Sequence, residues 1–157
     1  SVIESHPKQE ERRLARTDRF RQQHDELLVL AAQLQRLLDV EALAKDGSAA
    51  RRCLGEFLGK LALHLSVEDK VLYPELAANG DPQVASLARR FSTEMRATSA
   101  QVAEYSARWP TPSALKAKPA AFVQETRKVI GILADRIKRE NEELYSAADR
   151  VEGRLFA

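Results

Sequence analysis

Apolar residues recur at intervals of three and four along four long stretches of the chain. Leu54, Phe57 and Leu61 lie on one such face, and Leu133 and Ile137 lie on another. Strict alternation of apolar and polar residues, the mark of a strand, is almost absent. The pattern predicts four amphipathic helices, which cover roughly residues 11–40, 48–77, 82–108 and 119–150.

Three short breaks separate these stretches: "KDGS" at 45–48, "NGDP" at 79–82 and "WPTPS" at 109–113. Glycine, proline and capping residues of this kind end one helix and begin the next. Pro74 is expected to kink or fray the end of the second helix, and a short turn is expected at 113–117. Long helices with short connections predict an all-α, antiparallel up-down-up-down four-helix bundle.

Composition supports one globular domain over residues 1–157, with residues 1–10 as an N-terminal tail. The chain is 44% hydrophobic and 31% charged, and its formal net charge of +2 gives no reason to expect a nucleic-acid partner. No apolar run approaches the roughly 18 residues of a membrane span. A single cysteine, Cys53, excludes an internal disulfide and fits a reducing compartment. We therefore expect a cytoplasmic protein without membrane contact.

Two histidines and a glutamate interrupt the apolar faces of the first two helices. His24 follows Phe20 by four residues, His64 follows Leu61 by three, and Glu68 is four residues beyond His64. The two histidines lie at similar distances on either side of the first break. In an antiparallel pair they would share one level, about 24 Å from the turn at 1.5 Å per residue.

The third and fourth helices also place polar residues on their inner faces. Glu94 and Thr98 lie there on the third helix, and Arg136 and Glu140 on the fourth. Three glutamates buried singly would each cost several kcal/mol. Gathered around a metal ion or an arginine, they become acceptable. Imidazole and carboxylate together suit iron, zinc or manganese.

Two of these segments resemble each other. "VEDKVLYP" at 67–74 and "RENEELYS" at 139–146 share the frame x-E-x-x-x-L-Y. The repeat aligns Glu140 with Glu68 and Arg136 with His64. The fourth helix therefore has an arginine, which offers no lone pair to a metal, where the second has an imidazole.

The stretches "HDELL", "HLSVEDKVLYPEL" and "ENEELY" together resemble the hemerythrin-like (HHE cation-binding) domain family over nearly the whole chain. The resemblance implies a non-haem iron centre of one or two ions inside the bundle. It implies a role in binding or sensing dioxygen, nitric oxide or redox state, or in storing iron. His24 matches the first-helix histidine of that family, and His64 and Glu68 match its second-helix pair. On the third helix the family usually has histidine, and Glu94 is the nearest candidate here.

Two interpretations remain open from the sequence. In the first, an altered metal centre is formed by His24, His64, Glu68, Glu94 and Glu140, with Arg136 and Thr98 supporting the ligands from behind. In the second, no metal is bound. Arg136 then supplies the positive charge within a buried network, and the bundle acts as a protein-interaction or regulatory module.

Neither interpretation calls for catalysis. No nucleophile, phosphate-binding loop or acid–base pair in an open cleft is visible in the sequence, so we expect that the protein is not an enzyme. The favoured expectation is a metal-binding protein in a sensing, redox or stress-response role. Its expected partner is a small diatomic ligand or a regulatory protein.

Overall fold

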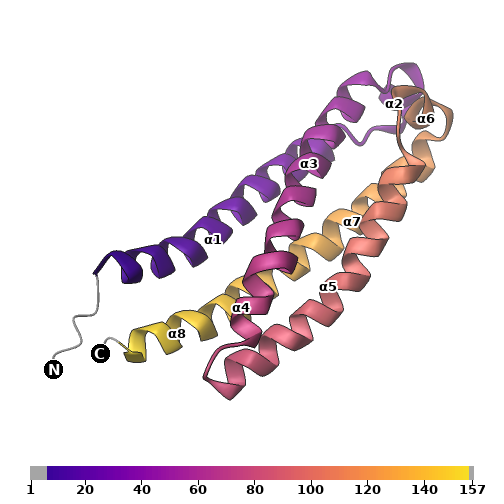
Figure 1. Ribbon diagram of the computed structural model, residues 1–157. Helices are drawn as coiled ribbons and strands as arrows, with labels where there is room; N and C mark the ends of the chain where they lie inside the picture. The colour runs from indigo at the N-terminus through magenta and orange to yellow at the C-terminus, as the bar shows by residue number, and fades with distance from the viewer. Residues whose placement is uncertain (1–6, 156–157) are drawn as a thin grey trace, which may run out of the picture.

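A computed structural model describes the backbone of residues 7–155 and the surroundings of the side chains of residues 17–150. Within residues 7–155 the chain is almost entirely helical and has no strand. The long helical segments lie side by side, and the chain reverses direction from each to the next (Figure 1). The all-α helical bundle predicted from the sequence is therefore present. The helices are α1 (Pro7–Arg36), α2 (Val40–Lys45), α3 (Ser48–Val67), η1 (Glu68–Leu72), α4 (Tyr73–Ala77), α5 (Pro82–Arg108), α6 (Pro112–Ala117), α7 (Pro119–Arg139), η2 (Glu140–Tyr145) and α8 (Ser146–Leu155).

The first predicted helix differs from the observed one at both ends. Helix α1 begins at Pro7, inside the predicted tail of residues 1–10, and the rest of that tail lies outside the described residues. It ends at Arg36 rather than near residue 40, and the separate short helix α2 follows. Asp39 accounts for this break, because its carboxylate accepts a hydrogen bond from the Ala42 amide and caps α2.

Helices α2 and α6 close one end of the bundle (Figure 1). The predicted short turn before the fourth long helix is α6, which Thr111 caps through its side-chain oxygen. Gly47 lets the start of α3 approach α6 closely. A Cβ atom at this position would lie 2.5 Å from the backbone oxygen of Pro112, so a side chain would force the two helices apart.

The second and fourth long segments each contain a π-helical turn, which the sequence analysis did not anticipate. The first, η1, ends directly before Tyr73 and Pro74, and the Tyr73 amide donates to the Glu68 carbonyl five residues earlier. Pro74 lacks an amide hydrogen, and the wider turn lies next to this gap in the hydrogen-bond ladder. The second, η2, forms without a proline. Turns of this type are rare and occur frequently at functional sites.

The buried apolar residues form two clusters with a polar layer between them. The larger cluster occupies the end near α2 and α6 and includes Leu34, Trp109 and Phe122. The smaller one occupies the opposite end and includes Phe91 and Leu144. Histidine, glutamate and arginine side chains separate the two clusters, and all of the following are at most 5% exposed: His24, His64, Glu68, Arg136 and Glu140.

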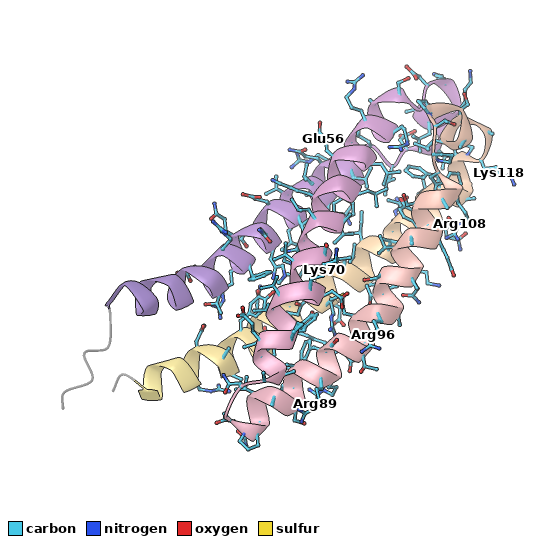
Figure 2. The ribbon with its side chains drawn as sticks, in the orientation of Figure 1. Glu56, Lys70, Arg89, Arg96, Arg108 and Lys118 are labelled. Atoms are coloured by element: carbon cyan, nitrogen blue, oxygen red, sulfur yellow. The ribbon has the colours of Figure 1, made fainter. Side chains whose placement is uncertain are left out.

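The outer surface is charged, as expected for amphipathic helices. Among the side chains that Figure 2 draws, charged groups of both signs project away from the bundle, including Glu56, Lys70, Arg89, Arg96, Arg108 and Lys118. Of the helices within the described residues, none combines the length and the apolar character needed to cross a membrane.

Candidate metal centre

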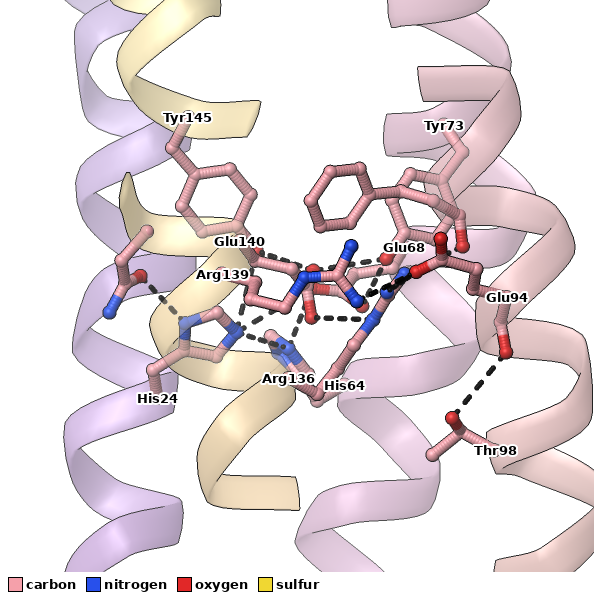
Figure 3. A network of polar contacts seen from close by, with 12 residues as sticks. His24, His64, Glu68, Tyr73, Glu94, Thr98, Arg136, Arg139, Glu140 and Tyr145 are labelled. Atoms are coloured by element: carbon pink, nitrogen blue, oxygen red, sulfur yellow. Dashed lines mark hydrogen bonds and ion pairs between the residues drawn. The ribbon is translucent and has the colours of Figure 1, made fainter. Parts of the chain in front are cut away.

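His24, His64 and Glu68 meet at the centre of the polar layer (Figure 3). The Nε2 atoms of His24 and His64 are 3.0 Å apart. The Oε1 atom of Glu68 lies 2.8 Å from the His64 Nε2 and 3.6 Å from the His24 Nε2. Helix α1 supplies the first of these residues, and α3 and η1 supply the other two. Three donor atoms from different turns of the bundle thus face one another.

The spacing of these three atoms fits the ligand set of a metal ion. Donors bound to a first-row metal at about 2.1 Å are separated by about 3.0 Å at right angles and 3.4 Å at the tetrahedral angle. The observed separations of 2.8, 3.0 and 3.6 Å surround those values. Two imidazoles and one carboxylate also form the facial set found in non-haem ferrous sites. Residues His24, His64 and Glu68 therefore suit a transition-metal cation in both chemistry and spacing.

Side-chain amides orient both imidazole rings. The Nδ1 of His24 lies 2.8 Å from the Asn141 Oδ1, and the Nδ1 of His64 lies 2.7 Å from the Gln23 Oε1. An amide oxygen only accepts hydrogen bonds, so each Nδ1 is the protonated nitrogen of its ring. In neutral rings both Nε2 atoms then carry lone pairs that face each other and the Glu68 carboxylate. Metal-binding histidines are commonly oriented in this way by a group behind the ring.

Two buried tyrosines complete the layer. Each lies five residues beyond the glutamate that begins its π turn, Tyr73 after Glu68 and Tyr145 after Glu140. The Tyr73 hydroxyl lies 3.2 Å from the Glu68 Oε2 and 3.0 Å from the Glu140 Oε2. The Tyr145 hydroxyl lies 2.7 Å from the Glu68 Oε1 and 3.3 Å from the Glu140 Oε2. Each phenol thus contacts both carboxyl groups.

The two glutamates differ in ionisation although both are buried. Burial alone would raise the pKa of Glu68, but hydrogen bonds to His24 and His64, which require a proton on the Nε2 that faces the carboxylate, outweigh it and hold that pKa well below its usual value. Burial and the nearby charge of Glu68 raise the pKa of Glu140 well above its usual value. In the layer without a metal, the surroundings therefore favour the charged form of Glu68 and the neutral form of Glu140.

Arg136 and Glu94 lie to one side of the three converging donors. Arg136 donates to the Glu94 Oε2 at 2.8 Å and to the Phe91 carbonyl at 2.6 Å, and its guanidinium covers the Phe91 ring. Its Nε has no hydrogen-bond partner among the described residues and is 3.8 Å from the Glu140 Oε1. Glu94 is 39% exposed and also pairs with Arg139. A hydrogen bond from Arg139 lowers the pKa of Glu94.

The structure brings together only part of the ligand set predicted from the sequence. His24, His64 and Glu68 converge, and Glu140 adjoins them through the tyrosines. Glu94 is not in that group, because Met95 takes the core-facing position on α5 and is 3% exposed. Thr98 does not support a ligand side chain. Its hydroxyl donates to the Glu94 backbone carbonyl at 3.4 Å.

The sequence analysis did not identify the other polar partners in this layer: Gln23, Tyr73, Asn141 and Tyr145. The two tyrosines carried a usable signal, since both belong to the repeated frame x-E-x-x-x-L-Y. Gln23 and Asn141 carried none, because each is adjacent in sequence to a predicted ligand and resembles an ordinary surface residue.

Comparison with known proteins agrees with this geometry. The family described as the hemerythrin HHE cation binding domain matches residues 15–148, which is most of the chain. Searches of curated proteins and of solved structures gave no match. The matched region contains both histidines, both buried glutamates and both π turns. The chain belongs to the hemerythrin HHE cation-binding domain family.

Proposed function

We propose that the protein binds one non-haem iron ion through His24, His64 and Glu68. The observation that carries this proposal is the pair of Nε2 atoms 3.0 Å apart, with both rings held by amide oxygens at Nδ1. Two lone pairs and a carboxylate oxygen directed at one point repel one another unless a proton or a cation lies among them. The family description and the two-histidine, one-carboxylate chemistry favour a metal cation.

Arg136 favours one ion rather than two. It occupies the position in the repeat that corresponds to His64, and its guanidinium adds a fixed positive charge 3.8 Å from the Glu140 Oε1. At about 4 Å, two unit charges at an effective dielectric near 20 interact by about 4 kcal/mol. A second cation beside Glu140 would meet that repulsion and would lack an imidazole ligand.

We propose a sensing or redox role for the bound ion rather than turnover of a substrate. Three protein donors leave coordination positions for a small diatomic ligand, and iron supplies a valence that such a ligand or the redox state can change. The donors are almost completely buried, which favours a small ligand over a large one. A regulatory protein that reads the state of the site is the corresponding partner.

A second candidate is a metal-free regulatory bundle. The observation that favours it is the hydrogen-bond network around Glu68, which already receives contacts from His64, Tyr73 and Tyr145. With one extra proton between the histidines, that network would have few unpaired groups. Measurement of the iron content separates this candidate from the iron-binding protein.

The test is elemental analysis of protein purified without chelator after iron-replete expression. The expected result is one iron per chain in the wild type and none in His64→Ala. Glu94→Gln is the matched control, since Glu94 lies outside the converging donors, and it should retain its iron. Iron should also raise the melting temperature of the wild type and of Glu94→Gln but not of His64→Ala.

Two results would contradict the metal site. One is a wild-type protein with much less than one iron per chain after reconstitution. The other is equal iron in the wild type and in His64→Ala. The first result would favour the metal-free bundle. The second, provided that circular dichroism shows His64→Ala to be folded, would place the iron outside this group of donors.

A further inference from the structure

Tyr145 lies at ligand spacing from two of the three converging donors. Its hydroxyl oxygen is 2.7 Å from the Glu68 Oε1 and 3.4 Å from the His24 Nε2. The separations among the three donors themselves run from 2.8 to 3.6 Å. The phenolic oxygen therefore extends the same cluster of donor atoms by one member (Figure 3).

The ring of Tyr145 is fixed in this place by its neighbours. It stacks on the His24 imidazole with centroids 5.4 Å apart and an angle of 19° between the planes. The Phe20 ring lies 6.0 Å away, and the Arg21 guanidinium lies 5.6 Å from the centroid of the tyrosine ring. The residue has no exposed surface. A donor that cannot swing away is already organised for binding, which reduces the entropy lost when a metal arrives.

We infer that Tyr145 is a fourth protein ligand of the iron ion proposed above, and that it binds ferric iron as a phenolate. This inference rests on the proposed function. As the oxygen–iron bond forms, the phenolic O–H bond breaks and the proton leaves to solvent. No electron is transferred and the iron stays ferric. A bound cation favours deprotonated ligands, and metal binding releases their protons.

Tyr73 provides an internal comparison. Its hydroxyl binds the other oxygen of Glu68, Oε2, together with the Oε2 of Glu140. It therefore lies on the side of Glu68 that faces the second glutamate, whereas Tyr145 lies on the Oε1 side that faces the imidazoles. The two tyrosines have the same chemistry and similar burial, and both reach the Glu140 Oε2, but they contact different oxygens of Glu68.

The experiment adds ferric nitrilotriacetate to the metal-free full-length protein and records the visible and resonance Raman spectra together with the iron content. A tyrosinate bound to ferric iron gives a visible charge-transfer band and enhanced ring modes of the phenolate. The expected result is this band in the wild type and in Tyr73→Phe. In Tyr145→Phe the band should be lost completely while iron remains bound with weaker affinity.

The outcomes separate this inference from the proposal on which it rests. Stoichiometric iron without a phenolate band in the wild type would overturn the tyrosine ligand and leave the iron site standing. Absence of iron in the wild type would overturn both. A band that survives in Tyr145→Phe and disappears in Tyr73→Phe would assign the ligand to Tyr73 and also overturn the inference.

If Tyr145→Phe failed to fold, the ligand could still be assigned from variants of the other two tyrosines. The chain has three tyrosines, and the third, Tyr105, hydrogen-bonds to Thr126 in the larger apolar cluster. A wild-type band that shifts on ring-deuteration of tyrosine and persists in both Tyr73→Phe and Tyr105→Phe identifies Tyr145 by itself. A band lost in either variant contradicts the inference.

Discussion

The segments His64–Tyr73 and Arg136–Tyr145 have the same construction, but the pKa values of their buried glutamates are shifted in opposite directions. Each has a glutamate at the start of a π turn and a tyrosine five residues later, and each tyrosine reaches both carboxyl groups. They differ four residues before the glutamate, where the first has an imidazole and the second a guanidinium. The setting favours the charged form of Glu68 and the neutral form of Glu140.

The difference arises from hydrogen bonding more than from formal charge. His64 lies 2.8 Å from Glu68 and supports its charged form directly when the Nε2 carries a proton. Arg136 is fully charged but stands 3.8 Å from Glu140, because its strong hydrogen bonds go to Glu94 and to the Phe91 carbonyl. A nearby cation without a good hydrogen bond does not overcome burial and the repulsion from Glu68. The position of a charge inside a bundle therefore matters as much as its sign.

The largest effect expected from this comparison is on stability. In metal-free protein, Glu68→Gln should lower the free energy of unfolding by about 3 to 5 kcal/mol, because removing one partner of a buried charged network leaves the others uncompensated. Glu140→Gln should cost less than about 1 kcal/mol, because burial and the charge of Glu68 favour the uncharged form of this group, which an amide resembles. Urea unfolding followed by circular dichroism in the presence of chelator measures both. Equal losses would show that the two glutamates do not differ in charge.

The sequence predicted the bundle and the alignment of the two segments, but it did not predict where the tyrosine side chains lie. Helical periodicity predicted the bundle, and the repeated frame aligned Arg136 with His64. The tyrosines were missed because in an ideal α-helix residues five apart point about 140° away from each other. The π turns bring the glutamate and the tyrosine to the same side of the helix. No residue pattern in η2 predicts such a turn.

Glu94 illustrates a second limit of prediction from the sequence. Periodicity places Glu94 and Met95 next to each other near the same helix face, so one residue of rotation decides which is buried. Met95 is buried in the smaller apolar cluster with Phe91 and Leu144, and this packing decides it in favour of Met95. Glu94 then becomes the outer partner of Arg136 and Arg139, which is a contact between helices that no single-helix pattern contains.

The next effect concerns the number of metal ions. Arg136→His gives the second segment the same residue types as the first and removes the guanidinium that opposes a second cation. We expect the iron content to rise from one to two ions per chain. At a hundred times its Kd, a second ion would add about 2.7 kcal/mol to the stability. Elemental analysis with protein quantitation measures the first change and thermal unfolding the second.

Arg139→His is the matched control for that substitution. Arg139 also pairs with Glu94 but is 35% exposed and lies outside the polar layer. Its replacement should leave the iron content at one. If Arg136→His also held only one iron ion per chain, Arg136 would not be the residue that prevents a second ion from binding beside Glu140.

The smallest effect is a pH dependence that separates the two segments in metal-free protein. Because the pKa of Glu68 is lowered in the folded state, its contribution is present above its ordinary pKa of 4.5 and is lost as the pH falls below that value. The pKa of Glu140 is raised, so the folded state keeps its proton where the unfolded state loses it. Stability should therefore fall as the pH rises above 4.5, by at most about 1.4 kcal/mol per pH unit from this group.

Subtracting the pH profile of Glu140→Gln from that of the wild type isolates the contribution of Glu140. The substituted protein has no titrating group at this position, so the loss above pH 4.5 should shrink while the loss on the acid side, due to Glu68, remains. Urea unfolding at a series of pH values, with chelator throughout, measures both limbs. If the two profiles were parallel above pH 4.5, Glu140 would be ionised like Glu68. Arg136 would then stabilise the Glu140 carboxylate as effectively as the histidines stabilise the Glu68 carboxylate.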